Sequence, residues 1–361
     1  MKLINVRSPY FITVNEVAQL GSKIELYIWK NGDAIPVTPN YTLSKKIPST
    51  TQLETNYNLS NFVKEFINIV SPTFVASPTI ESNNNWVNVQ VKRYSLTTTY
   101  NLLDTTDYVC VNGYNEYVDG YNKLNTNLKI VSLTDQTKAI NYERENGIPY
   151  INIFIDSTLG DKLELNYTDA RGRNLTNVIV INIADASTKG LYKIPISTTN
   201  IKYDEYNNLE IKYTSGINIY SFNYKVNAIC ENKYTPVLCS FINKNGGWEF
   251  LTFFKAQTNN IQTKGTEYKL NQSSVNYNPL IGQNKSLNIN GQQSVKLNTG
   301  WVDENYSNTI KELLLSETIL LDNKPAQVKT QTSDLKTSLK DMIINYEIEF
   351  TYSYNLLNDV V

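Results

Sequence analysis

The sequence predicts a mainly β protein made of several antiparallel β-sandwich domains, of Ig-like or tail type, with one or two short flanking helices. Apolar and polar residues alternate along many short stretches, turn dipeptides separate these stretches, and helical periodicity is confined to two segments. The chain has 361 residues, which is longer than a usual single sandwich. At about 100 to 200 residues per domain, about two to four domains are expected.

The clearest alternation lies near the C-terminus, and it predicts a long strand with one buried and one solvated face. Its apolar positions are Ile344, Tyr346, Ile348, Phe350, Tyr352 and Tyr354. The same period occurs at Ile24, Leu26 and Ile28; Val87, Val89 and Val91; Ile151, Ile153 and Ile155; Leu163, Leu165 and Tyr167; and Tyr220, Phe222, Tyr224 and Val226. Turn dipeptides that favour tight hairpins stand at Asn31-Gly32, Asn112-Gly113, Asp119-Gly120, Ser215-Gly216, Asn245-Gly246 and Asn290-Gly291.

Two segments show helical spacing instead. In "NLSNFVKEFINIV" the apolar residues recur three and four positions apart, which predicts a helix over 59–69 with Asn58 or Ser60 as N-cap. In "YSNTIKELLLSE" the same spacing behind Ser307 predicts a helix over 307–316. Each would be short and amphipathic and would flank a sheet.

Breaks in the strand pattern predict four domains. A linker is expected at 71–86, where two Ser-Pro pairs and an Asn run disfavour regular structure, with further breaks near 186–189 and at 271–285. The predicted domains are a β-sandwich over 1–80 that includes the first helix, and two further sandwiches over 86–188 and 189–282. The last, over 283–361, would contain a β-hairpin, the second helix and the long C-terminal strand.

Charge and hydropathy exclude several classes of partner. The chain has 33 basic and 34 acidic residues without a run of like charge, so direct nucleic-acid recognition is not expected. No apolar stretch approaches the roughly 18 residues that cross a bilayer, and the first residues lack the apolar core of a signal peptide. Synthesis in a cytoplasm is expected. Cys110, Cys230 and Cys239 are too few for a disulfide framework and are expected to be buried free thiols.

The sequence contains no histidine, which removes whole classes of catalytic mechanism. Ser-His-Asp and Cys-His arrangements cannot exist, and zinc sites that use His are excluded. The cysteines lack the spacing of a Cys-only zinc site, and no Gly-rich phosphate-binding motif is present. We therefore expect no enzyme activity, no cofactor and no metal site.

Paired carboxylates remain as catalytic candidates, because glycoside hydrolysis needs only two acids. Glu143 with Glu145 and Asp204 with Glu205 are such pairs. Both pairs lie beside turn residues, where solvated acids are common, so a surface role is the simpler interpretation.

Two polar turns offer further candidate sites. The oxygen-rich turn around Asn115, Glu116 and Asp119 could hold Ca²⁺ but lacks the spacing of a calcium loop, which favours a solvated turn. The segment "DARGRN", 169–174, places two arginines at a loop tip. They could bind a carboxylate of a partner subunit, or the loop could simply face solvent.

The stretch "FINKNGGWEFLTFFK", 241–255, is the most aromatic part of the chain. As a strand it would direct Trp248, Phe250 and Phe254 to one side and Leu251 and Phe253 to the other, so both faces would be apolar. A domain core, a contact between subunits or domains, and a ligand platform are all open interpretations. A core is favoured because aromatic residues are mostly buried or interfacial.

Several segments together resemble tail proteins of tailed bacteriophages of Bacteroidota, including crAss-like podoviruses. These segments are "NVRSPYFI", "NYNLSNFVKEFI", "LCSFINKNGGWEFLTFF", "GWVDENYSNTIKELLLSETILL" and "INYEIEFTYSYN". The likeness covers most of the chain through short segments and carries no catalytic motif. It implies a tail-type sandwich fold and a virion structural protein that forms a tail hub, ring or adaptor in multiple copies. The implied partners are other copies in a ring and other tail proteins or fibres, within a virion assembled in a bacterial cytoplasm.

Aromatic residues are the expected anchors of cores or interfaces, because Tyr and Trp combine apolar area with a hydrogen-bonding end. The candidates are Trp248, Phe250, Phe253, Phe254, Trp301, Tyr346, Tyr352 and Tyr354. Two other functions stay open. A receptor-binding or glycan-binding adhesin predicts exposed aromatic rings, and a glycan hydrolase predicts two acids in a cleft.

Overall fold

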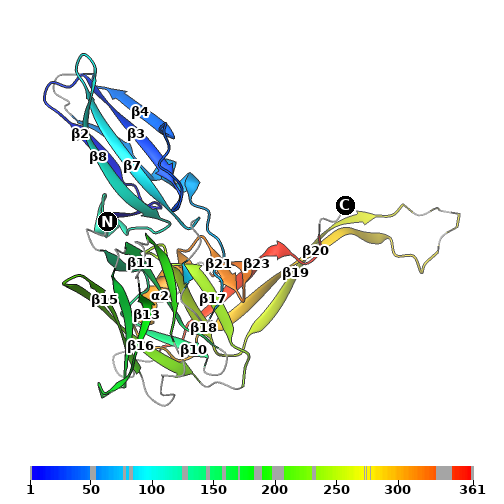
Figure 1. Cartoon of the computed structure of the whole chain (residues 1–361). Helices are drawn as coiled ribbons and strands as arrows, with labels where there is room; N and C mark the ends of the chain where they lie inside the picture. Colours follow the sequence, from blue (N-terminus) through cyan, green and yellow to red (C-terminus); the bar gives the residue numbers. More distant parts are fainter. Residues whose placement is uncertain are drawn as a thin grey trace. The chain divides into compact units, whose positions relative to one another are not determined.

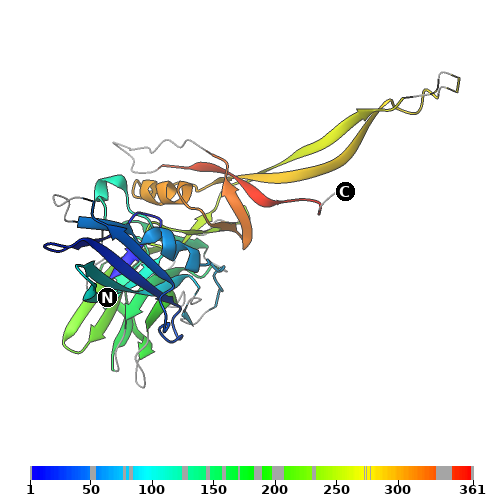
Figure 2. The same ribbon diagram turned by 90° about the horizontal axis from the view of Figure 1, so that it is seen from above.

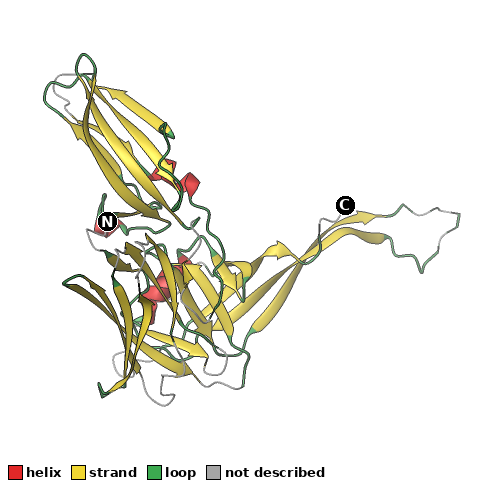
Figure 3. Cartoon of the chain, viewed as in Figure 1, coloured by secondary structure: helices red, strands yellow, loops and turns green. Residues whose placement is uncertain are grey.

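The computed structural model describes residues 2–48, 54–75, 79–80, 84–123, 129–143, 147–156, 160–169, 171–182, 189–196, 207–229, 233–271, 273, 275–276, 278–330 and 344–358. This part of the chain is mainly β, with several antiparallel sheets and two short α-helices, which confirms the predicted fold class (Figures 1 and 3). The chain divides into two compact units, Met1–Cys230 with Phe241–Leu251, and Glu231–Ser240 with Thr252–Val361.

The first unit begins with a sandwich of a five-stranded sheet and a two-stranded sheet. The larger sheet has the order β1 (Leu3–Asn5), β8 (Tyr100–Val111), β7 (Trp86–Leu96), β3 (Gly21–Trp29) and β4 (Tyr41–Lys46). β1 pairs with β8 in parallel, and the other neighbours are antiparallel. The smaller sheet pairs β2 (Phe11–Asn15) with β5 (Glu54–Asn58). Ile24 and Val89 of the larger sheet share one buried core with Ile12 and Val14 of β2.

A second sandwich in the same unit packs a five-stranded sheet against a four-stranded sheet. The first has the order β10 (Ala139–Glu143), β16 (Asn218–Ile229), β15 (Asn207–Ser215), β12 (Lys162–Thr168) and β13 (Asn174–Asn182), with β10 and β16 parallel. The second has the order β6 (Thr79–Ile80), β14 (Lys189–Pro195), β11 (Tyr150–Asp156) and β9 (Ile130–Ser132). Ile153 and Ile194 pack against Leu165 and Ile211 in their common core.

A smaller core joins strands of these two sandwiches. Trp86 and Val109 of the N-terminal sheet are buried with Phe154 of β11 and Leu191 of β14. The rings of Trp86 and Phe154 meet edge to face with centroids 4.9 Å apart, the geometry that aromatic quadrupoles favour.

The remaining sheet has seven strands, and the division between the two units falls within its strands β17 and β18. Its order is β18 (Trp248–Phe253), β17 (Val237–Ile242), β21 (Ile319–Leu321), β22 (Lys324–Val328), β23 (Glu347–Asn355), β20 (Asn284–Asn298) and β19 (Thr258–Lys269). Within the second unit, Phe253 and Phe350 stack edge to face with centroids 5.7 Å apart. Their burial fixes which face of β23 is internal.

The alternating segments form the expected strands. Those at 24–28, 87–91, 151–155, 163–167 and 220–226 lie in β3, β7, β11, β12 and β16. At the C-terminus the regular strand is β23, and Ile344 forms an isolated bridge with Val302 ahead of it. Burial of the alternating face ends after Phe350, because Tyr352 is half-buried and Tyr354 is exposed.

Both predicted helices exist but are shorter than 59–69 and 307–316. The first is one α-turn, α1 (Ser60–Val63), followed by a 3₁₀ turn, η1 (Lys64–Phe66), and Ile67 is already extended. Asn58 accepts a hydrogen bond from the Ser60 N–H (3.2 Å) but does not occupy the N-cap position. The second helix, α2 (Tyr306–Leu314), buries Tyr306, Thr309, Ile310 and Leu313.

Strand pairing crosses every predicted domain boundary. β3 pairs with β7 across 80–86, β12 with β15 and β11 with β14 across 188–189, and β19 with β20 across 282–283. At the third boundary the consecutive strands β19 and β20 belong to one sheet, whereas β6 and β7, and likewise β13 and β14, belong to different sheets. Sequence reasoning placed breaks there because local composition marks the end of a strand and carries no information on which distant strand pairs with it.

Candidate interaction surfaces

The aromatic stretch around β18 is mostly internal. Trp248, Phe253 and Phe254 are buried, and Phe250 is half-buried. The side-chain amide of Asn152 donates a hydrogen bond to the Trp248 carbonyl oxygen, which ties β18 to β11. Because its largest rings are covered by the chain itself, this stretch does not form an exposed platform for a ligand.

The tight turn before β18 is organised by Asn243. Its side-chain oxygen accepts hydrogen bonds from the N–H groups of Asn245 (3.0 Å) and Gly247 (3.1 Å). Gly246 adopts φ +80°, and a Cβ there would lie 2.8 Å from the Gly113 nitrogen and 2.9 Å from the Val111 side chain. Glycine is therefore required by both backbone conformation and space.

A buried ion pair lies beside this turn. Lys138 Nζ and Glu249 Oε1 are 2.6 Å apart, with side-chain exposures of 2% and 3%. The second carboxylate oxygen of Glu249 accepts a hydrogen bond from the Asn243 amide (3.1 Å). Buried charges of this kind are tolerated only when they are paired and hydrogen-bonded, so the arrangement fixes β18 against the loop before β10.

Phe250 belongs to a partly buried aromatic cluster with Phe74 and Tyr150, whose ring centroids lie 5.6 to 5.7 Å from one another. The fully buried Lys193 places Nζ 5.1 Å from the Phe74 ring centroid and 4.9 Å from the Tyr150 ring centroid. A desolvated cation over two rings gains electrostatic attraction from both. These contacts give Phe250 a structural role at the edge of the core.

The other candidate anchors separate into buried and exposed residues. Tyr346 is buried, whereas Trp301 is 69% exposed. The rings of Tyr352 and Tyr354 lie 5.6 Å apart on the outer half of β23. Trp301 and Tyr354 are thus available to a partner, and the remaining anchors serve mainly the core.

Those predicted polar residues that lie in the described part of the chain have structural roles. Glu143 is half-buried in β10, and its predicted partner Glu145 lies outside the described residues, as do Asp204 and Glu205. The described residues contain no cluster of three or more Cys, Asp or Glu side chains placed to hold a metal ion. Cys110 and Cys239 are buried free thiols whose pKa is raised by burial, while Cys230 is outside the described part.

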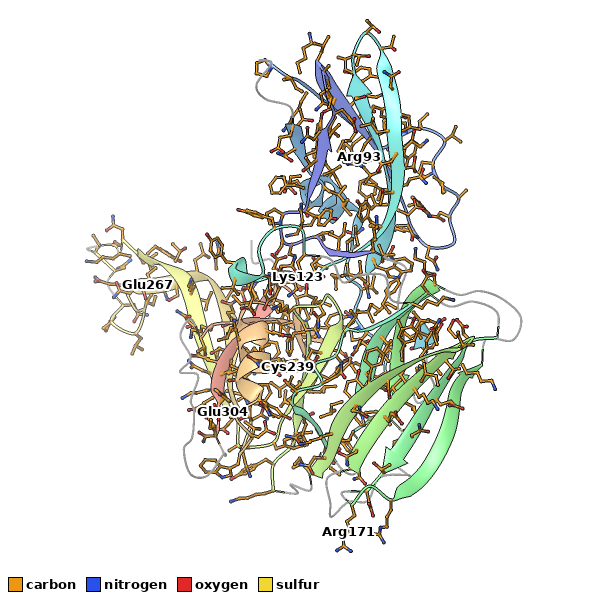
Figure 4. The ribbon with its side chains drawn as sticks, turned by 90° about the vertical axis from the view of Figure 1, so that its left-hand side faces the viewer. Arg93, Lys123, Arg171, Cys239, Glu267 and Glu304 are labelled. Atoms are coloured by element: carbon orange, nitrogen blue, oxygen red, sulfur yellow. The ribbon has the colours of Figure 1, made fainter. Side chains whose placement is uncertain are left out.

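The "DARGRN" loop is held by its own carboxylate. Asp169 accepts hydrogen bonds from the N–H groups of Arg171 and Arg173 (both 2.9 Å) and pairs with the Arg173 guanidinium (2.6 Å). The backbone N–H of Arg173 and its side chain hold the pKa of Asp169 below its usual range. Figure 4 shows Arg171 at the loop tip with its side chain directed away from the strands.

The turn around Asn115, Glu116 and Asp119 presents apolar side chains to solvent. Its 3₁₀ segment, η2 (Tyr117–Asp119), is closed by Lys244, which lies 3.1 Å from Glu116 and 3.2 Å from Asp119. Lys123, at 2.7 Å, contributes most to holding the pKa of Asp119 well below its usual range. Figure 4 labels Lys123 on this segment. The lysines occupy the carboxylates that a calcium ion would need.

The most exposed part of the chain that the structure describes is a two-stranded ribbon that we call the arm, residues 258–270 and 283–291. Figure 2 shows β19 and β20 running together as this long ribbon. All of β19 is exposed, and β20 pairs with β23 only from Gln292 to Asn298. In the described part of the chain, no third strand pairs with the segment of β20 from Asn284 to Gly291. Its exposed apolar side chains are Ile261, Tyr268, Leu270, Leu287 and Ile289.

Two glycines shape the apolar surface of the arm. A Cβ at Gly291 would lie 3.5 Å from the Ile261 side chain and 3.0 Å from the Leu356 side chain, and a Cβ at Gly265 would lie 2.8 Å from the Ile289 side chain. Sequence analysis predicted a turn at Asn290-Gly291, which was wrong because both residues lie within β20. The Asn290 amide instead bonds the backbone of Leu357 (3.1 Å), and a bulge at Asn288, with φ +54°, interrupts the ladder.

Comparisons with known proteins identify no relative. No model of a known protein family matches the chain, and no curated protein matches it. Among the described residues, no helix is long and apolar enough to cross a membrane.

Proposed function

We propose that this chain is a virion structural protein of a tailed bacteriophage that assembles in multiple copies into the tail, as a hub or ring component. The observation that supports assembly most strongly is the arm. An isolated two-stranded ribbon is at best marginally stable in water, so a ribbon exposed on both faces gains stability when a partner covers it. The phage assignment rests on the sequence resemblance to tail proteins of Bacteroidota phages.

The arm also has the size of an interface. Its roughly 20 residues match one side of a standard protein interface, which uses about 20 to 30 residues. β19 is an edge strand of 12 residues without proline. An edge strand of this length presents a row of unpaired backbone groups with which another chain can pair.

Contacts with neighbouring tail proteins or fibres, rather than catalysis, are the proposed activity. The chain would then be found in the virion tail after assembly in the cytoplasm of the bacterial host. Direct nucleic-acid recognition is not part of the proposal, because the near-zero net charge offers no basic track along a phosphate backbone.

The test is the oligomeric state of the purified chain, measured by mass photometry and negative-stain microscopy. Rings or larger assemblies are expected. Cross-linking mass spectrometry on intact particles should then join the arm to a second protein chain. Monomers at every concentration, together with absence from particles, would contradict the proposal.

A second candidate, a receptor-binding or glycan-binding adhesin, is favoured by one observation. The turn at 114–122 holds Tyr117, which is 95% exposed, beside exposed Val118 and Tyr121. The side chain of Asn122 bonds both the N–H (2.6 Å) and the carbonyl oxygen (3.1 Å) of Phe11, so the rings are presented on a fixed loop. Fixed aromatic rings lose little entropy on binding. Saturable binding of a surface polysaccharide that Tyr117→Ala abolishes would support this candidate.

A further inference from the structure

Formal charge is segregated along the sequence that contains the arm. Residues 258–291 carry Lys264, Lys269 and Lys285 against a single acid, Glu267, whereas residues 292–361 carry ten acids and six lysines. Figure 4 labels Glu267 on the arm and Glu304 in the acidic part, just before α2. The arm is therefore basic and the rest of this region is acidic.

An exposed tryptophan stands within the acidic part. Trp301 lies between Gly300, at φ +73°, and Val302, which is buried and exchanges backbone hydrogen bonds with Ile344 (both 2.7 Å). Asn298 accepts a hydrogen bond from the Gly300 N–H (2.8 Å). These anchors hold the backbone on both sides of Trp301, so its exposed ring is presented by a fixed turn.

Two acidic residues follow the ring closely in sequence. Asp303 and Glu304 come after Val302 and are half-buried, and the Asp303 carboxylate accepts a hydrogen bond from the Asn305 N–H (3.1 Å). We call Trp301, Asp303 and Glu304 the tryptophan turn. Its formal charge of −2 is opposite to that of the arm, and tryptophan is the ring that binds cations best and is enriched at interface hot spots.

The lysines of the arm cannot reach the tryptophan turn of their own chain. Lys264 pairs with Asn290 and Lys269 with Asn284 of β20, and Lys285 lies in β20 itself, so all three are at least eight residues from Asn298, just before the turn. At about 3.3 Å per residue this extended strand places them roughly 26 Å or more from the turn. A contact between the two surfaces therefore requires two molecules.

We infer that the arm of one copy of this chain docks on the tryptophan turn of a second copy. The arm lysines approach Trp301, Asp303 and Glu304, while Ile261, Tyr268 and Leu287 pack against the exposed ring. Because the two surfaces differ, the contact is head to tail, and repeated rotation closes it into a ring. This inference rests on the proposed function, because it assigns the surfaces through which the copies assemble.

The decisive test uses two variants that each lose one surface. Lys264→Glu/Lys269→Glu reverses the charge of the arm, and Trp301→Ala removes the ring from the turn. Each variant alone should weaken self-association at least tenfold by sedimentation velocity. A 1:1 mixture should form dimers and stop, because it contains one intact arm and one intact turn per pair. Tyr117→Ala, which removes an exposed ring elsewhere, is the matched control and should assemble as the wild type does.

A charge exchange tests the pairing directly. Adding Asp303→Lys/Glu304→Lys to the arm variant should restore assembly, and 0.5 M salt should weaken assembly of the wild type because exposed charges are screened. If the wild type assembles and Trp301→Ala assembles equally well, or if the mixture gives no dimer, the inference is wrong and the proposed function stands. If the wild type stays monomeric at all concentrations yet cross-links to other proteins in particles, the head-to-tail contact is wrong and the arm serves a different protein. A wild type that is both monomeric and absent from particles overturns both.

Discussion

The buried Lys138–Glu249 pair allows a quantitative test of how β18 is held. Glu249→Gln leaves the Lys138 ammonium, 2% exposed, without its charged partner 2.6 Å away. Removal of one partner from a buried pair typically costs about 3 to 5 kcal/mol, because the remaining charge stays desolvated. With an m-value of about 2 to 3 kcal/mol per M in urea, the midpoint should fall by about 1 to 2.5 M.

Unfolding in urea followed by tryptophan fluorescence is a suitable assay, since Trp86 and Trp248 are buried in the first unit. Lys138→Met/Glu249→Gln removes both charges and should lose less than Glu249→Gln alone, by about 2 kcal/mol or more. The control is Asp104→Asn at the partly exposed Arg93–Asp104 pair, at 2.5 Å, which should cost about 1 kcal/mol or less. A Glu249→Gln cost no larger than that of the control, or a double variant that loses as much stability as Glu249→Gln alone, would refute the reasoning.

Three further predictions concern the turns and the titrating groups. Gly246→Ala should lower the free energy of unfolding, measured in urea, by about 2 to 4 kcal/mol. The control is Gly216→Ala, which should cost about 1 kcal/mol because Gly216 has φ +58° but no atom near the position of its Cβ. Equal costs would show that space at Gly246 is irrelevant. The lowered pKa of Asp119 means that its stabilising contacts are present above the unfolded pKa near 4 and are lost as pH falls through the lower folded value, which a carboxyl NMR titration measures. Burial and the hydrogen bond to Glu25 raise the pKa of Tyr94 to about 12. The contribution of Tyr94 to stability is therefore present below about pH 10 and is lost as pH rises toward 12. A tyrosinate absorbance step near pH 10 that Tyr94→Phe removes would contradict this.

Strands with one buried face were predictable because burial leaves a period of two in the sequence. Leu163, Leu165 and Tyr167 are buried in β12 and alternate with residues that are not buried, as their spacing indicated. The arm was not predicted, because a strand without a buried face leaves no such period in the sequence. β19 reads "TNNIQTKGTEYK", and since neither of its faces is buried by the chain, no alternation records it. Its available signal was a long segment rich in Thr and Asn without proline, beside a second such segment.

Pairing between distant strands was not predictable from local pattern. β1 lies beside β8, more than 100 residues away, through Leu3 opposite Val109. The residues of β1 and of β8 each fit the sequence pattern of a strand, but neither segment indicates which strand it pairs with. Parallel partners require long connections, which local turn signals do not describe.

The tryptophans show how tertiary position decides the role of a residue with the same local sequence context. Trp248 and Trp301 each follow a glycine that ends a turn, yet Trp248 is buried and Trp301 is exposed. Trp248 begins a strand whose neighbour Glu249 is paired inside the unit, so its ring is carried inward. Trp301 sits where the chain is fixed by Val302 on one side and by Asn298 on the other, so its backbone cannot turn to bury the ring. Such a ring gains stability only when another molecule covers it, which is why an exposed tryptophan on a fixed turn is a stronger indication of an interface than aromatic composition alone.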